Sequence, residues 1–186
     1  MLAKTPKSAL AAHPIWLDLA LVAFLVGFDV VARLLPHAPG FMPVAASALF
    51  AGRVLRIPAL AVIVPVAAMA LSNLWLPTED WRITTIGALA ISVAAFAGML
   101  TRRWNGPLPV VGAMLTCSLI FFAASNFAVW AFSGMYPLTA AGLVQCYVAA
   151  LPFLDKTILG DLFWTGVLFG GAWLVQNGTA LARRAS

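Results

Sequence analysis

The chain has 186 residues, of which 63% are hydrophobic and only 9% are charged. A soluble domain is about half apolar and about a quarter charged, so this composition excludes an ordinary soluble protein and indicates an integral membrane protein of one domain. The net charge of +5 comes from basic residues that stand singly or in pairs, which excludes the clustered basic face of a nucleic-acid-binding protein.

Six apolar segments predict an all-α, polytopic fold with six transmembrane helices, because about 17–25 apolar residues cross a bilayer. They cover residues 15–35, 41–55, 57–76, 83–100, 110–133 and 158–177. The second segment is short, which favours a tilted helix or one that lies inside the bundle. Residues 134–157 are expected to form an outer loop that contains a short helix over 143–154, with Pro152 breaking that helix near its end.

Basic pairs assign an orientation to these segments. With six spans, all the pairs fall on one side of the membrane: Lys4/Lys7, Arg53/Arg56, Arg102/Arg103 and Arg183/Arg184. The other side receives single basic residues, accompanied by acidic ones. The positive-inside rule therefore predicts that both termini are cytoplasmic.

Small residues at four-residue spacing recur along the chain, a pattern that lets helix backbones approach closely. The pairs are Ala23/Gly27, Ala48/Gly52, Ala94/Gly98 and Gly166/Gly170. Packing within the bundle is the preferred interpretation. As an alternative, Ala23 and Gly27 of the first helix are candidates for docking another membrane subunit.

Polar and aromatic residues gather toward the predicted outer side. Polar groups at membrane depth are costly and usually face a protein interior or a cavity. The candidate solute-binding residues are Asn73, Asn126, Trp130, Tyr136, Gln145, Tyr147, Asp161 and His37. Among the aromatic residues, Trp130 and Tyr147 are expected on a cavity wall, whereas Trp81 is expected in a belt at the lipid headgroups.

Asp29 and Arg33 stand four residues apart near the outer end of the first helix, a spacing that predicts an ion pair, for which a structural role is favoured. His37 alone makes no metal site. Cys117 and Cys146 match no metal or redox spacing, so they are expected to be free thiols. We expect no resident metal or cofactor.

Catalysis has little support in the sequence, which contains no HExxH, GxSxG, Walker A or CxxC motif. Active transport by this chain would therefore need a partner or another source of energy. Two classes stay open beside a solute-binding protein. One is a structural or assembly subunit of an envelope complex. The other is a membrane enzyme acting on a lipid or cofactor precursor, in which Asp161 and Asn126 would need a third polar partner.

Several motifs resemble an uncharacterised family of small bacterial membrane proteins, over about residues 41–171. They are FxPxAxxALFAG (41–52), SNL (72–74), NFxVW (126–130), YPxTxxGLxxCYxxALPF (136–153), GD (160–161) and LFG (168–170). That family resembles in turn the S components of energy-coupling-factor (ECF) transporters, small six-helix proteins that capture vitamins and metal ions. The resemblance implies an S-component-like bundle in the inner membrane of a bacterium.

The same resemblance implies a function: capture of a vitamin-like solute at the outer face, its uptake into the cytoplasm, and a first helix that meets a transmembrane coupling subunit with its ATPase. One branch of such proteins takes up vitamin B12 without a recognised coupling module, which makes cobalamin a candidate solute. That branch has a cysteine ligand to cobalt in the loop after the third helix, but residues 77–82 read PTEDWR here. His37 or Cys146 would have to serve instead, or the cobalt would have no protein ligand.

Overall fold

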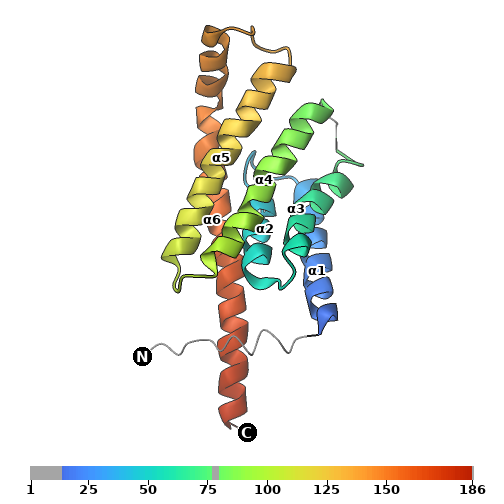
Figure 1. The fold of residues 1–186 in the computed structure, drawn as a ribbon, viewed down its shortest axis with the longest axis vertical. Coiled ribbons are helices and arrows are strands. Elements are labelled where there is room, and N and C mark those ends of the chain that lie inside the picture. The colour runs from blue at the N-terminus through green and yellow to red at the C-terminus, as the bar shows by residue number, and fades with distance from the viewer. Residues whose placement is uncertain (1–13, 77–79, 186) are drawn as a thin grey trace.

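A computed structural model of the chain describes residues 14–76 and 80–185, with side chains through residue 177. These residues form α-helices that alternate in direction along the long axis of the molecule (Figure 1). The helices are α1 (Ile15–Leu34), α2 (Val44–Val54), α3 (Pro58–Ser72), α4 (Trp81–Thr101), α5 (Leu108–Phe132) and α6 (Ala140–Ala185). The prediction of an all-α fold is confirmed for this part of the chain.

Four helices are long and apolar enough to cross a membrane: α1, α4, α5 and the Ala140–Asn177 part of α6. The other two are shorter, with 11 residues in α2 and 15 in α3. At about 1.5 Å per residue they extend roughly 17 and 23 Å, less than the roughly 30 Å apolar core of a bilayer. The described chain is thus a multi-helix membrane protein in which four helices, rather than the expected six, meet the requirement for a full span.

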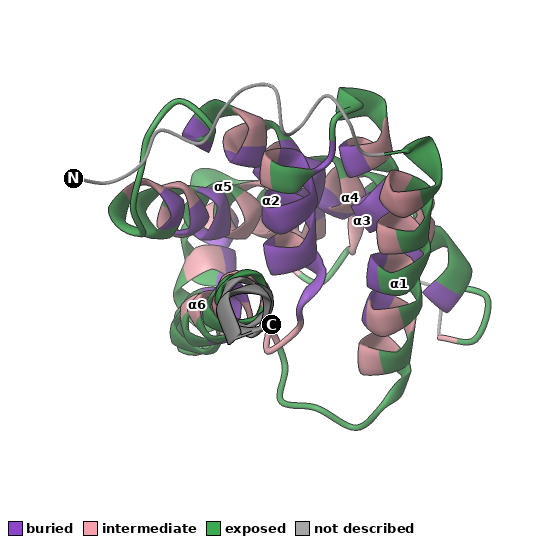
Figure 2. Ribbon diagram, turned by 90° about the horizontal axis from the view of Figure 1, so that it is seen from below, coloured by how far each residue is buried: buried purple, intermediate pink, exposed green. Residues whose placement is uncertain are grey.

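The short helix α2 lies inside the bundle and packs against the other five helices. Its residues from Ala46 to Gly52 are all buried, whereas the surrounding helices expose large parts of their outer surfaces (Figure 2). A helix enclosed by protein needs no full span, because neighbouring helices surround its polar ends. Of the two alternatives for the second segment, the structure therefore supports a helix that lies inside the bundle.

Glycines allow α2 and α4 to approach closely. A Cβ atom added at Gly52 would overlap the backbone carbonyl of Ala95, and one added at Gly98 would overlap the carbonyl of Leu49. Packing within the bundle is therefore confirmed for these two small-residue pairs. The other glycines of this pattern have no such neighbour within 4 Å in the described structure: Gly27, Gly166 and Gly170.

Two arginines join the C-terminal ends of α2 and α4. Arg53 donates hydrogen bonds to the backbone carbonyls of Thr101 and Trp104 at the end of α4. Arg102 in return donates to carbonyls at the end of α2. The last carbonyls of a helix have no partner within it, so a cation that reaches them stabilises that end. The α2–α3 turn is thereby held beside the end of α4.

The connection before the last helix differs from the sequence prediction. An outer loop with a short helix was expected over 134–157, but α6 is one continuous helix of 46 residues from Ala140, and the connection is only 133–139. The hydroxyl of Thr139 caps this helix by accepting from the backbone N–H of a residue three positions on. Pro152 does not end it, because membrane helices tolerate proline where neighbouring groups satisfy the freed carbonyl. The loop prediction is wrong.

Candidate functional site

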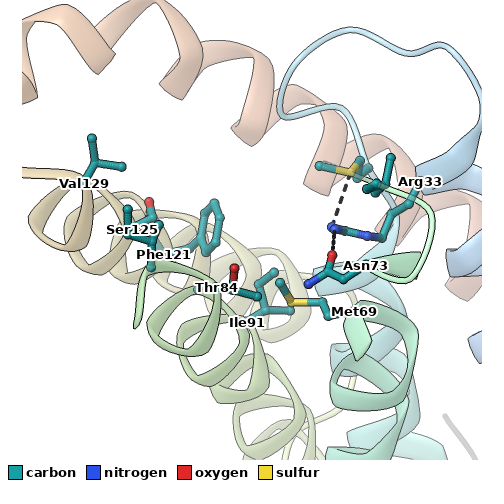
Figure 3. Close-up of a pocket in the computed structure, with 12 residues that line it drawn as sticks. Arg33, Met69, Asn73, Thr84, Ile91, Phe121, Ser125 and Val129 are labelled. Carbon is teal, nitrogen blue, oxygen red and sulfur yellow. Dashed lines mark hydrogen bonds between the residues drawn. The ribbon is translucent and has the colours of Figure 1, made fainter. Parts of the chain in front are cut away.

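A cavity of about 350 Å³ opens between the ends of α3, α4 and α5 that lie away from the α2–α3 turn. Arg33 of α1 and Met42 of the α1–α2 connection bound it on one side (Figure 3). We call it the Arg33 cavity, and its remaining lining residues are Met69, Asn73, Leu76, Ile83, Thr84, Gly87, Ile91, Phe121, Ser125 and Val129. Its volume lies in the range of small-molecule sites in proteins.

Neutral groups hold the half-buried guanidinium of Arg33 at this cavity. Its Nε donates to Ser72 Oγ at 2.7 Å, and its Nη2 donates to Asn73 Oδ1 at 3.1 Å. Its Nη1 lies 3.9 Å from the sulfur of Met42, as the dashed lines on this side of the cavity show (Figure 3). The side chain is thus positioned by three contacts, none of which carries a negative charge.

Asp29 is not the ion-pair partner of Arg33 that the spacing predicts, since no contact within 4 Å joins them. Asp29 is fully buried, and its Oδ1 accepts a hydrogen bond of 2.8 Å from the hydroxyl of Ser47. Its Oδ2 has no hydrogen-bond partner in the part of the chain that the structure describes. The ion-pair prediction is wrong because α2 offers Asp29 a donor inside the bundle.

A second, smaller cavity of about 50 Å³ adjoins the first and shares four lining residues with it, Arg33 among them. Asp161 of α6 lines this second cavity. Its buried carboxyl accepts a 2.6 Å hydrogen bond from the hydroxyl of Ser118, which joins α6 to α5. Two predicted solute-binding residues, Asn73 and Asp161, therefore line adjacent cavities.

His37 lies apart from the Arg33 cavity. It is exposed, its Nδ1 is 2.9 Å from the carbonyl oxygen of Leu35, and it lines a third cavity of about 250 Å³ beside α1 and Trp164. Among the described residues, no group of three or more His, Cys, Asp or Glu side chains could hold a metal ion. The two cysteines are free, as predicted, and both are buried.

Asn126, Trp130 and Tyr147 make hydrogen bonds elsewhere and line none of these cavities. Trp130 Nε1 donates to the carbonyl of Pro137 at 3.0 Å, and the Tyr147 hydroxyl donates to the carbonyl of Ala123 at 2.5 Å. The Asn126 side chain bonds within α5. Trp130 and Tyr147 thus lie outside the three cavities described here, and their place on a cavity wall stays a prediction. Both aromatic groups donate to backbone carbonyls, Trp130 to one in the α5–α6 connection and Tyr147 of α6 to one on α5.

The remaining predicted residues lie on the surface or near it. Tyr136 is partly buried in the α5–α6 connection, and Gln145 is exposed on α6. Neither lines a cavity described above. Ala23 and Gly27 are exposed on α1, and a Cβ atom added at Gly27 would meet none of the described residues within 4 Å.

Arg33 and Thr84 line the cavity although the sequence did not single them out for binding, and so does Ser125, whose hydroxyl could equally have bonded helices together. Arg33 is predicted to pair with Asp29, and single hydroxyl residues in helices are too common to stand out. One signal is present in the sequence: the predicted topology puts Arg33 and Asn73 at helix ends on the same side. Their meeting could have been proposed from that placement.

The start of α4, beside the cavity, is fixed by Asp80. Its carboxyl accepts from the backbone N–H of Arg82 at 2.8 Å and pairs with the Arg82 guanidinium at 2.7 Å. Hydrogen bonds from the side chain and then the backbone of Arg82 lower the pKa of Asp80 to about 2. The cap is therefore ionised at neutral pH, where a negative charge at a helix N-terminus is favourable.

Comparison with known proteins identifies a family. The model of a family of unknown function, DUF6580, matches residues 14–182. No curated protein and no solved structure matches the chain. The family match carries no activity and no link to S components or vitamin B12 transport.

Proposed function

We propose that this chain, which belongs to the DUF6580 family, is a membrane transport protein. It binds a small solute at the outer face of the membrane and moves it into the cytoplasm, in the manner of an S component. One observation carries this proposal: the Arg33 cavity combines a few placed polar groups with an apolar wall at one end of a helix bundle. Concave, mostly apolar sites of this kind are typical of small-molecule binding.

The cavity is proposed to face outward. The helix ends that line it lie opposite the two turns that carry Arg53, Arg56, Arg102 and Arg103. Basic turns favour the cytoplasmic side. Because α2 and α3 form a hairpin, counting them as two spans or as none leaves both termini on the same side. The proposed cytoplasmic position of the termini in the inner membrane thus does not depend on whether the chain spans four or six times.

Labelling of single cysteines in intact cells tests this orientation. In a chain whose Cys117 and Cys146 are replaced by alanine, a membrane-impermeant maleimide should label Asp80→Cys but not Arg103→Cys. Permeabilised cells should show both labels, which controls for accessibility of the thiols. Labelling of Arg103→Cys alone in intact cells would place the cavity on the cytoplasmic side and contradict capture from outside.

The cavity volume favours a solute smaller than a corrinoid. About 350 Å³ lies near the lower end of the range of roughly 300–1,000 Å³ that is typical of ligand sites. Cys146 is buried and donates its S–H to the carbonyl of Asn126, and His37 lines a different cavity. Neither candidate ligand for cobalt therefore lies at the Arg33 cavity. Cobalamin remains one of the solutes to be tested for binding.

A transmembrane coupling subunit with its ATPase is the partner that this proposal implies. The exposed face of α1 is its proposed docking surface; it includes Ala23 and Gly27 and the large exposed side chains of Trp16 and Phe24. The bilayer itself is the other neighbour of this apolar face. Gly27→Leu should abolish co-purification of the coupling subunit and leave solute binding unchanged. That result would show that docking and solute capture use different surfaces.

Retention of a solute is the direct test. Native mass spectrometry of the full chain in a mild detergent should show a small molecule of defined mass, one per chain. Adding that molecule back should raise the unfolding temperature of the emptied protein. An empty protein that no member of a panel of vitamins, cobalamin and metal ions stabilises would contradict the proposal and favour an assembly subunit.

A further inference from the structure

Among the described residues, Arg33 has no ion-pair partner within 4 Å at the cavity, and Asp29, one turn earlier on α1, attracts it only from beyond that distance. The three contacts of Arg33 are with the hydroxyl of Ser72, the amide oxygen of Asn73 and the sulfur of Met42, all neutral. No acidic side chain of the described residues forms an ion pair with it. A cation in the last turn of an apolar helix is costly without a partner of opposite charge, so the site is suited to receive that partner from outside the chain.

The guanidinium also keeps donors for such a partner. A guanidinium has five N–H groups, and three of them are directed at the contacts just described, which leaves two. Because the Asn73 oxygen accepts from Arg33, the NH₂ group of the same amide is a further donor, and it points into the cavity (Figure 3). Thr84 adds a hydroxyl that has no hydrogen-bond partner among the described residues.

Donors therefore predominate at one end of the cavity, and none of its described lining residues carries a carboxylate. The rest of the wall is apolar, with the side chains of Met69, Ile91 and Phe121. The carboxyl group of Asp161 lies on the adjoining cavity and already accepts from a serine. Charge-assisted hydrogen bonds from an arginine fork are the strong and directional way to hold an oxygen anion.

We propose that the Arg33 cavity binds an amphipathic anion, whose carboxylate or phosphate group lies against Arg33, Asn73 and Thr84 and whose apolar body lies along Met69, Ile91 and Phe121. For a transported solute this identification rests on the proposed function. The same chemistry has a second source, the headgroup of an anionic phospholipid, and the experiment distinguishes the two.

Matched probes test the charge requirement. The full chain, purified in an uncharged detergent, is titrated with benzoate, phenyl phosphate and the neutral isostere benzamide, with binding followed by calorimetry and by unfolding temperature. Wild-type protein should bind at least one of the two anions more tightly than benzamide. Arg33→Gln should weaken the binding of that anion by about 10- to 100-fold, which is the effect of losing a hydrogen bond to a charged group. The affinity for benzamide should stay unchanged.

Several variants separate recognition from folding. Thr84→Val removes a donor without a described partner, so it should weaken anion binding several-fold without lowering the unfolding temperature. Arg33→Lys keeps the positive charge but loses the paired N–H donors of the guanidinium. Its affinity for the anion should lie between those of wild type and Arg33→Gln. Arg103→Gln, an equal charge change at the other end of the bundle, should bind as wild type does. Glu79 lies outside the described residues, and Glu79→Gln should bind at least as well as wild type.

The possible outcomes distinguish the anion site from the proposed transport function. Equal binding of benzoate, phenyl phosphate and benzamide, or an anion preference that survives Arg33→Gln, overturns the inference while leaving solute capture intact. A retained molecule that contains phosphorus and has the mass of a phospholipid, displaced by phosphatidylglycerol but not by phosphatidylcholine and dependent on Arg33, supports the anion site and contradicts the proposed transport function. A retained soluble anion with the same dependence supports both.

Discussion

Replacing Gly52 or Gly98 with alanine is expected to lower the free energy of unfolding by about 1–3 kcal/mol, the usual cost of forcing extra volume into a packed core. An added methyl group at Gly52 would overlap the carbonyl of Ala95, and one at Gly98 would overlap that of Leu49. In both cases the overlap is with backbone, which cannot rotate away. The helices would have to separate, and the buried contacts around α2 would loosen with them.

The matched controls are glycines of the same four-residue pattern whose added Cβ would meet no neighbour within 4 Å. Gly27→Ala and Gly166→Ala should leave the protein as stable as wild type, or stabilise it by up to about 1 kcal/mol through better helix propensity. Unfolding can be followed by tryptophan fluorescence as sodium dodecyl sulfate is added to protein in a mild detergent. Equal effects at Gly27 and Gly52 would contradict the close α2–α4 crossing.

Ser47→Ala is expected to be the most costly change at a polar core residue. The Ser47 hydroxyl is the described donor to the fully buried Asp29, at 2.8 Å, and Asp29 Oδ2 already lacks a described partner. Removing this donor leaves the whole carboxyl group unsatisfied, which typically costs about 1–3 kcal/mol. The free energy of unfolding should fall by that amount in the same detergent titration.

Ser92 supplies a control of the same residue type and similar burial. Its hydroxyl donates only within its own helix, to the carbonyl of Ala88, so Ser92→Ala should change stability by less than about 0.5 kcal/mol. A double-mutant cycle sharpens the test. With Asp29→Leu present, Ser47→Ala should lose most of its effect, because replacing both partners with apolar groups can be nearly neutral. An undiminished effect would show that Ser47 acts through something other than Asp29.

The candidate site was only partly predictable from sequence, and Asn73 and Trp130 show why. Both were predicted to bind a solute, because each is a polar or aromatic residue at membrane depth. For Asn73 the partner is Arg33, 40 positions away, and both line the cavity. For Trp130 it is Pro137, 7 positions away, and the bond closes the α5–α6 connection. Cost at membrane depth predicts that a polar group finds a partner, but not which one.

The last helix shows the same limit for secondary structure. Pro152 favoured a break between a short helix and a final span, yet α6 runs through it. Proline weakens a helix locally, but the packing of α6 against α5 supports it over this length. Thr139, which caps the start of the helix, is the sequence signal for that start. It lies within the predicted loop 134–157, so it was not interpreted as a cap.

Composition and the lengths of the apolar runs determine by themselves that this chain is an all-helical membrane protein, because backbone polar groups in a bilayer have to be satisfied within each segment. The basic pairs by themselves support a proposed orientation. Only the tertiary structure decided that α2 is enclosed, that Asp29 turns to Ser47 and that Arg33 is left facing a cavity. Those outcomes depend on contacts between residues far apart in the chain, such as Arg33 with Ser72 and Ser118 with Asp161, which no local pattern specifies.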